Sequence, residues 1–203
     1  MVQIFVKGGP VMWPLLITSI VALSVVFERL FFVLRERVRR DPETVEKVFS
    51  EMEDGEYEHA LIESRKSQDY VAKVLAHALS HREQSPVHAL VRAAGRELNR
   101  FNRGLSILDT VITLAPLLGL LGTVTGMIRS FSLLGGQELG APTAITGGIA
   151  EALIATAFGL LIAIIALIPF NFLNAKMEEA RHHIEDAASR MDALLRSTAV
   201  TER

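Results

Sequence analysis

The stretch that decides the fold is Gly147–Phe172, GGIAEALIATAFGLLIAIIALIPFNF, in which Glu151 is the single charged residue. Two further stretches, Gly8–Phe27 and Thr110–Ile128, carry no charge at all. A helix needs roughly 20 apolar residues to cross a hydrocarbon core of about 30 Å, and all three stretches are long enough. Buried helices of a soluble domain are usually shorter and apolar on one side only. The sequence therefore predicts three transmembrane helices.

The composition agrees with a membrane protein and excludes several other classes. Half of the 203 residues are hydrophobic, the formal net charge is −2, and there is no cysteine. A chain this apolar is not disordered, and without cysteine it has neither disulfides nor a cysteine-ligated metal. A charge near zero gives no support for a nucleic-acid partner.

The charges beside the spans predict the topology. Pro10 and Pro14 interrupt the start of the first apolar run, and no small-residue cleavage site follows it, so we expect a retained span. Arginines cluster after the first span and before the second, and basic residues also follow the third. Basic ends face the cytoplasm, which places the N-terminus outside, in a bacterial periplasm, and the C-terminus inside.

This topology divides the chain into seven segments. We expect a periplasmic N-terminus (1–10), a first transmembrane helix (11–34), a cytoplasmic helical region (35–104), a second transmembrane helix (105–134), a periplasmic loop (135–143), a third transmembrane helix (144–175) and a cytoplasmic C-terminal helix (176–203).

The segments outside the spans have apolar residues at helical spacing. Two such stripes are Val45, Val48, Phe49 and Met52, and Val71, Val74, Leu75, Ala78 and Leu79. Gly55 is expected to end one helix, and Ser85–Pro86 to begin another that runs unbroken to Leu134 over about 70 Å. Spacings of 3 and 4 after the third span predict that its helix continues. The fold class is an all-α integral membrane protein, with spans two and three extended as long helices into the cytoplasm.

Small residues share one face in each of the last two spans. They are Gly119, Thr123, Gly126 and Ser130 in span two, and Ala152, Thr156, Gly159 and Ala163 in span three. Small residues let helices approach closely in lipid, so tight packing explains the glycines. A mid-span threonine hydroxyl either bonds its own helix or serves an ion, a water or a partner carboxylate.

Glu151 is the strongest single signal, because a charge within the bilayer costs roughly 2.5–3.5 kcal/mol on insertion scales. Its side chain should face protein or water, as an ion-path residue or as a structural carboxylate. Arg129 is either its partner or extends to the headgroups. Glu28, Arg29 and Asp109, at inner span ends, are expected at the interface, and Trp13 at the outer one.

The sequence carries no motif of a soluble enzyme, so we expect no enzyme and no cofactor. Six histidines are scattered along the chain. His77 and His81 have a spacing that suits a metal, but no further ligand motif supports one. We expect all six histidines on a solvated surface.

Two motifs resemble a known family. LAPLLGLLGTVTGMIRSF (Leu114–Phe131) and the stretch Gly147–Phe172 are similar to the MotA/TolQ/ExbB proton-channel family, above all to its three-span ExbB and TolQ branch. The resemblance implies a homo-pentamer in the bacterial inner membrane, around a dimer of a single-span ExbD/TolR-type partner with an essential membrane Asp. Proton-motive force would move this dimer, and the work would pass to a TonB-like or TolA-like protein.

The resemblance also implies roles for single residues. Thr123 and Thr156 correspond to the pore-lining threonines, Glu151 to the membrane Glu and Pro116 to the span-two Pro. With Pro116, the residues expected to pack the helices are Gly119, Gly122, Gly126 and Gly159.

The chain departs from the enteric pattern at Thr125, where TolQ and enteric ExbB usually have an aromatic residue, and it is shorter than those proteins. We expect an ExbB-like energiser of TonB-dependent outer-membrane transport or a related envelope process, coupled to H⁺ with Na⁺ left open. The alternatives are a passive ion channel, a membrane scaffold of the same oligomer, and a TolQ-like or gliding-motor homologue.

Overall fold

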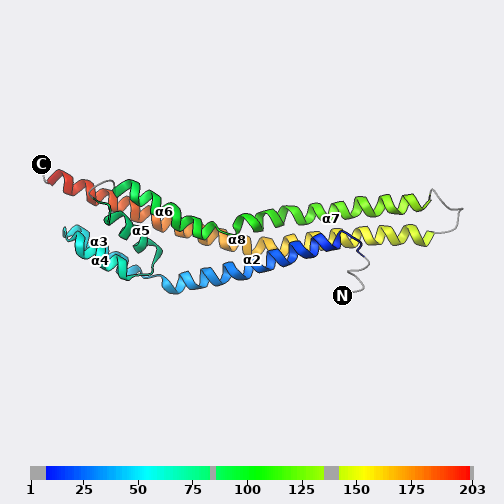
Figure 1. Ribbon diagram of the computed structural model, residues 1–203, viewed down its shortest axis with the longest axis horizontal. Helices are drawn as coiled ribbons and strands as arrows, with labels where there is room; N and C mark the ends of the chain where they lie inside the picture. Colours follow the sequence, from blue (N-terminus) through cyan, green and yellow to red (C-terminus); the bar gives the residue numbers. More distant parts are fainter. Residues whose placement is uncertain (1–7, 83–85, 135–141, 202–203) are drawn as a thin grey trace. The chain divides into compact units, whose positions relative to one another are not determined.

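The computed structural model describes residues 8–82, 86–134 and 142–201, and within these ranges the chain is helical without a strand (Figure 1). The helices are α2 (Met12–Arg39), α3 (Pro42–Glu53), α4 (Tyr57–Lys66), α5 (Tyr70–Leu79), α6 (Pro86–Asn102), α7 (Leu105–Leu134) and α8 (Pro142–Thr201). They form two compact units. The first holds the chain up to Arg29 together with Gly104–Phe172, and the second holds Leu30–Arg103 and the chain from Leu173.

Three helical stretches of the described chain are long and apolar enough to cross a membrane, and the prediction of three spans is confirmed. They lie within Met12–Arg39, Pro86–Ser132 and Thr146–Arg196. Only 11% to 28% of the most apolar part of each is buried within the chain itself. Such exposed apolar surface is suited to lipid or to neighbouring subunits rather than to water.

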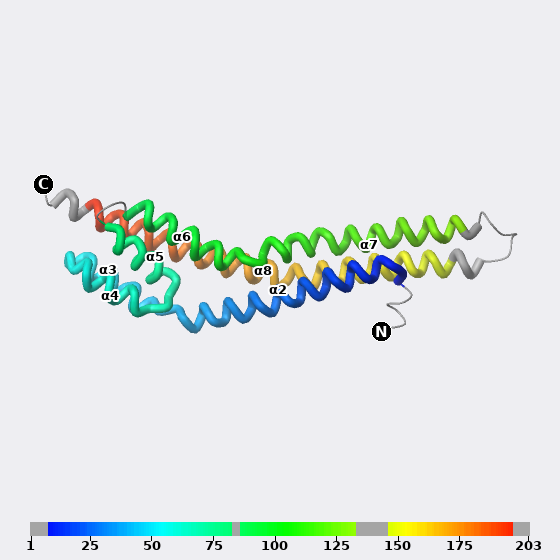
Figure 2. The backbone as a smooth tube through the Cα atoms, viewed as in Figure 1, coloured from blue at the N-terminus to red at the C-terminus, as the bar shows by residue number. Residues whose placement is uncertain are grey.

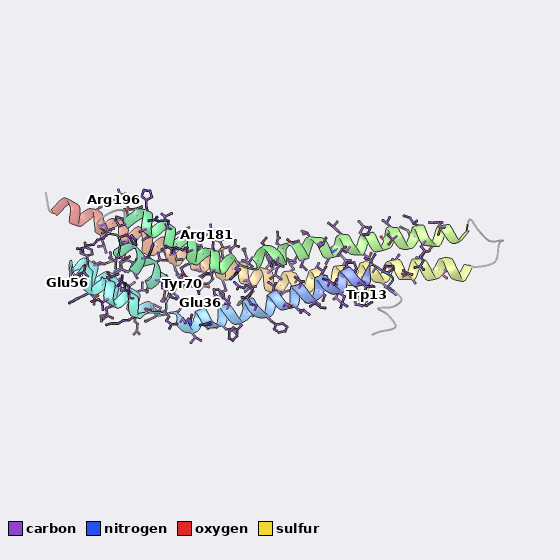
Figure 3. All side chains as sticks on the ribbon, in the orientation of Figure 1. Trp13, Glu36, Glu56, Tyr70, Arg181 and Arg196 are labelled. Atoms are coloured by element: carbon purple, nitrogen blue, oxygen red, sulfur yellow. The ribbon has the colours of Figure 1, made fainter. Side chains whose placement is uncertain are left out.

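In the first unit, the start of α2 lies beside α8 in the view of Figure 2, and its buried residues belong to one core with residues of both α7 and α8. Met12 and Leu15 of α2 form a core with Ala115 of α7 and Ala155 of α8. Leu118, Phe158 and Ile162 lie against this core and are partly buried. Trp13, labelled in Figure 3, is 64% exposed on the chain's surface.

The second unit contains the short amphipathic helices, and the apolar stripe predicted for the first of them is confirmed. Asp41 caps α3 by accepting a hydrogen bond from the amide of Thr44, and Pro42 occupies the first helical turn. Val45, Val48, Phe49 and Met52 are buried. Gly55 follows α3 with a φ of +80°, as its expected role in ending this helix requires.

Asp69 fixes the segment that enters α5. Its carboxylate is fully buried and accepts hydrogen bonds from the Arg40 guanidinium at 2.7 and 2.9 Å and from the amides of Asp41 and Val71. These bonds join the chain at Arg40 and Asp41 to the start of α5. The five apolar residues predicted as the stripe of this helix are all buried.

The predicted unbroken helix from Pro86 to Leu134 is wrong at one point. The helix α6 ends at Asn102 and α7 begins at Leu105, with Gly104 between them at a φ of +83°. A Cβ at Gly104 would lie 3.0 Å from a Val25 methyl and 3.2 Å from the Arg29 Cδ. Glycine is therefore suited to this position both by its backbone angle and by the space available.

The third apolar stretch continues as one helix into the tail, as the spacing predicted, because α8 runs from Pro142 to Thr201. The tail buries Met177, Ala180, Ile184, Ala187 and Met191. The expected loop at 135–143 lies outside the described residues except for its last two, which already belong to α8.

The expectation of six solvated histidines is wrong for His183. The hydroxyl of Tyr70, labelled in Figure 3, lies 2.7 Å from the His183 Nδ1. Burial raises the pKa of Tyr70 to about 12 and lowers the pKa of His183. His77 is also engaged, since its Nε2 lies 2.8 Å from a guanidinium nitrogen of Arg96. The sequence shows neither contact, because the partners lie on different helices.

Candidate functional site

The candidate site lies in the first unit, along the seam between α7 and α8, where small residues of both helices meet. Gly119 and Gly159 face the opposite backbone: a Cβ at Gly119 would lie 3.0 Å from the Thr156 Cα, and one at Gly159 would lie 2.5 Å from the Ala115 carbonyl oxygen. Real Cβ atoms essentially never approach to 2.5 Å, and 3.0 Å is tighter than most of their contacts, so the two glycines allow the helices to lie this close.

The seam continues toward the ends of α7 and α8 that the 135–141 segment joins. A Cβ at Gly122 would lie 2.5 Å from the Ala155 Cβ, and one at Gly126 would lie 2.9 Å from the Ala152 Cβ. Further along, a Cβ at Gly148 would collide with the Ser130 hydroxyl. Gly148 was not singled out from the sequence, although it stands in a Gly-Gly pair at the start of the span.

Pro116 lies half-buried within α7. Proline has no amide hydrogen, so the Ile112 carbonyl one turn earlier has no helical donor from this position. Gly119 follows within one turn. In this part of α7 one helical hydrogen bond is therefore missing, and the helix approaches α8 closely at the same place.

Thr156 joins the two helices directly. Its hydroxyl donates a hydrogen bond of 2.9 Å to the Gly119 carbonyl, and the side chain is half-buried at the edge of the seam. The bond crosses from α8 to α7 and is not the local bond to its own helix that a membrane threonine often makes. The hydroxyl oxygen keeps acceptor capacity for a further donor.

Thr123 behaves differently. Its hydroxyl donates to the Leu120 carbonyl of its own helix at 2.6 Å. It lies four residues beyond Gly119, or about 6 Å along the axis of α7, so the two threonines are about one helical turn apart in depth. Among the interactions described for this unit, none links Thr123 to Thr156 directly.

Both threonines nevertheless lie on the same side of the α7–α8 pair. At about 100° per residue, Thr123 is about 140° around α7 from Leu118, and Thr156 is about 160° around α8 from Phe158. Leu118 and Phe158 are the residues that pack with the start of α2. The threonines therefore lie on the side opposite to α2, which no described helix of this unit covers.

Glu151 lies on the same seam, toward the ends of α7 and α8 that the 135–141 segment joins. One of its carboxylate oxygens is 3.8 Å from an Arg129 guanidinium nitrogen, and the Glu151 side chain is 24% exposed against 69% for Arg129. Gly9 approaches the carboxylate from the other direction, because a Cβ there would collide with Glu151. The carboxylate is thus held between a cation of α7 and the segment before α2, as its charge requires in an apolar environment.

Gly9 is a neighbour of Glu151 that sequence reasoning missed. Its φ is +75°, a left-handed conformation that suits glycine, and it directly precedes Pro10. The Gly-Gly-Pro sequence indicates a turn, but it does not reveal which side chain the turn approaches.

The charged residues at the other ends of the spans are arranged unevenly. Arg29 is 4% exposed and its partner Glu28 is 61% exposed, and the two form an ion pair. Arg29 is therefore buried under the Gly104 turn, and its expected place at the membrane interface stays a prediction. The Asp109 side chain is exposed.

The architecture defines the class: an all-α, multi-pass membrane protein whose second and third spans meet along a seam of small residues that bears the hydroxyls of Thr123 and Thr156 and the carboxylate of Glu151. The model of the MotA/TolQ/ExbB proton channel family matches residues 62–186. This match covers more than half of the chain, and it includes α7 and most of α8. The chain belongs to this family.

Individual relatives agree with the assignment. The ExbB-like 1 biopolymer transport protein of Synechocystis sp. is 36% identical over 203 residues, covering 95% of this chain and 78% of the relative. The biopolymer transport protein ExbB of Xanthomonas campestris is 37% identical over 105 residues, 48% of this chain and 42% of the relative. The Tol-Pal system protein TolQ of Haemophilus influenzae is 37% identical over 91 residues, 45% of this chain and 40% of the relative. ExbB-type and TolQ-type relatives thus both match, and the last two over less than half their length.

Proposed function

We propose that the chain is the stator-type subunit of a motor in a bacterial inner membrane that proton-motive force drives. Five copies form a ring around two copies of an ExbD/TolR-type single-span partner. Proton flow moves the partner, which energises a TonB-like or TolA-like protein and, through it, transport across the outer membrane or a related envelope process. The N-terminus lies in the periplasm and the C-terminus in the cytoplasm, consistent with the basic span ends.

One observation carries this proposal: Thr123 and Thr156 lie on the side of the α7–α8 pair that α2 leaves uncovered. On that side the threonines are flanked by Leu120 and Leu160, which are 57% and 48% exposed. In a ring with this side inward, hydroxyls would be the polar groups of a mainly apolar lumen. A partner carboxylate there is costly when charged and much less costly when protonated.

The proposal gives each polar residue a task. The Thr156 hydroxyl, already held by the Gly119 carbonyl, offers its lone pairs to a protonated partner carboxyl at a fixed angular position. The Thr123 hydroxyl is held only by its own helix and is free to turn toward a charged carboxylate. Glu151, paired with Arg129, lies near the outer end of the path. H⁺ is the proposed coupling ion, and Na⁺ is the alternative because hydroxyl oxygens also ligate cations.

The test compares Thr123→Val and Thr156→Val with a matched control, Thr125→Val. Thr125 lies two residues from Thr123, so it points about 200° away around α7, and its hydroxyl also bonds its own helix at 2.9 Å. The first two variants should lose proton-driven function while native mass spectrometry shows the same assembly. The Thr125→Val control should keep both proton-driven function and assembly. Full function in Thr123→Val and Thr156→Val would refute the assignment of the lumen.

A passive channel formed by the same ring is the second candidate. The hydroxyls of Thr123 and Thr156 support this candidate, because in a ring with their side inward they would be polar groups along the pore. Native mass spectrometry separates the two functions, because the motor requires a co-purifying single-span protein at two copies per ring. A ring that conducts without such a protein would support the channel.

A further inference from the structure

The second unit carries a row of positive charge on α6. We call His88, Arg92, Arg96 and Arg103 the basic stripe. All four are exposed, and the spacings of 4 and 4 keep His88, Arg92 and Arg96 on one side of α6. Arg103 follows directly after the end of α6 at Asn102, and at the helical rise per residue the row extends for about 22 Å.

Within the ranges that the structure describes, no carboxylate compensates the arginines of the basic stripe. Among the described residues, Arg92, Arg96 and Arg103 form no ion pair with a carboxylate. Arg96 donates instead to the backbone carbonyl of Arg92 at 3.4 Å and contacts the His77 ring. The pKa of His77 is lowered by its burial and then by the positive charges of Arg96, His81 and Arg92. By contrast, Arg100 on the same helix pairs with Glu36 at 3.0 Å.

Apolar side chains border this row. Val87 and Val91, one turn apart on α6, are 50% and 61% exposed, and Val91 directly precedes Arg92. Exposed valines beside unpaired guanidinium groups are typical of a protein-binding surface, where apolar contacts and arginines occur together.

A row of negative charge of the same length lies on the tail of α8. We call Glu178, Glu185 and Asp192 the acidic stripe. Their spacing of 7 keeps them on one side of the helix over about 21 Å. Their side chains are 44%, 62% and 40% exposed.

The partners of the acidic stripe are all local. Glu178 is 3.6 Å from Arg181, Glu185 is 3.9 Å from His182, and Asp192 is 2.9 Å from Arg196, each within the same helix. Exposed pairs of this kind contribute little to stability and are readily exchanged. The three carboxylates therefore remain available to cations of another chain.

The two stripes are opposite in sign and similar in length, and an interval of seven residues occurs in both. Seven residues separate Arg96 from Arg103, and seven separate Glu178 from Glu185. Arg103 ends its part of the second unit, and Glu178 lies shortly after the chain returns to that unit at Leu173. Arg103 and Glu178 are thus the members of the two stripes nearest in sequence to the first unit, and Arg96 and Glu185 each lie seven residues farther from it.

We propose that the basic stripe of one copy docks on the acidic stripe of α8 in a second copy. The proposal deepens the proposed function, because it rests on the ring of identical chains and names a surface that joins neighbours outside the membrane. The surfaces differ, so the contact is head-to-tail and repeats around a closed ring. Opposite charges also fix the register of neighbouring chains and disfavour back-to-back pairing.

The absence of cysteine makes a direct test clean. Two differently tagged full-length chains, one with Arg96→Cys and one with Glu185→Cys, are co-expressed and oxidised in membranes without proton-motive force. The expected product is a cross-linked heterodimer that carries both tags. A matched pair, Glu58→Cys on the exposed face of α4 with Glu185→Cys, should give none. Cross-linking of the Arg96→Cys chain to another protein, and not to the Glu185→Cys chain, would overturn the proposal.

A charge exchange tests the chemistry of the contact. Arg96→Glu with Arg103→Glu should weaken self-association about tenfold, because like charges then face one another. Adding Glu178→Arg and Glu185→Arg should restore it, whereas Arg65→Glu with Lys66→Glu on α4 should leave it unchanged.

Lack of restoration in a variant with normal helix content would overturn the proposal. Failure of the motor function would not affect these results, since they require neither a gradient nor a partner. Conversely, if the ring functions but the Arg96→Cys and Glu185→Cys chains do not cross-link, the proposed function would stand and the proposed docking surface would be refuted.

Discussion

Replacing Gly159 by alanine tests whether the seam between α7 and α8 holds the first unit together. The added Cβ would lie 2.5 Å from the Ala115 carbonyl oxygen, whereas a carbon and an oxygen normally approach to about 3.3 Å. The helices must therefore separate by about 0.8 Å or distort. Such overpacking costs about 1–3 kcal/mol, against about 1 kcal/mol that alanine contributes through its better helix propensity.

Gly147→Ala is the matched control, because it lies in the same helix and a Cβ there would meet nothing within 4 Å. The free energy of unfolding of this control should rise only by the gain in helix propensity. The two variants should then differ by about 1–3 kcal/mol in the free energy of unfolding. For a chain of this length each kcal/mol shifts the melting temperature by about 2–4 °C.

The assay is thermal unfolding of the purified proteins in one detergent, followed by circular dichroism of the helices. Gly159→Ala should melt below Gly147→Ala, and the Thr156 hydroxyl should lose its bond to the Gly119 carbonyl as the helices separate. Equal melting temperatures would show that the seam does not limit stability, and the argument from close approach would be wrong.

Three further predictions concern the second unit. Asp69→Asn should lower the free energy of unfolding by about 1.5–3 kcal/mol in denaturant titrations, because a buried, charged acceptor is lost, while the exposed control Glu58→Gln should have little effect. In a Tyr57→Phe variant, ultraviolet absorbance should report ionisation of Tyr70 near pH 12, since burial raises its pKa; ionisation near pH 10 in folded protein would contradict this. Burial lowers the pKa of His183 below its ordinary 6.5, so the unfolded chain binds more protons than the folded chain. The contribution of neutral His183 to the free energy of unfolding is therefore present above pH 6.5 and is lost as the pH falls below it. Denaturant midpoints at about pH 7.5 and 5.5 should therefore differ less in His183→Gln than in the original chain.

The sequence was sufficient for the features that depend on local pattern. Runs without charge located the spans, and a stripe of apolar residues ended by Gly55 located α3. The small residues of spans two and three indicated a close approach, which the buried Gly119 and Gly159 display. These signals repeat at helical spacing, so they survive without knowledge of the neighbouring helix.

Features that depend on the register between helices could not be predicted in the same way. The hydrogen bond from Thr156 to the Gly119 carbonyl requires one particular register of α8 along α7. The approach of Gly9 to Glu151 depends on a turn outside the spans, and the contact of Tyr70 with His183 joins residues far apart in sequence. Gly104 was visible as a glycine, but a single glycine within a helical pattern is often tolerated, so its turn was missed.

The proposed function requires that proton flow through the ring is coupled to a partner. The most direct measurement is proton uptake, driven by a pH gradient, into liposomes that hold the chain with its co-purified single-span partner or the chain alone. We predict proton uptake only when the partner is present. The Thr156→Val variant should lose this uptake while its assembly stays intact. Equal uptake by the chain alone, or uptake unchanged in Thr156→Val, would contradict it.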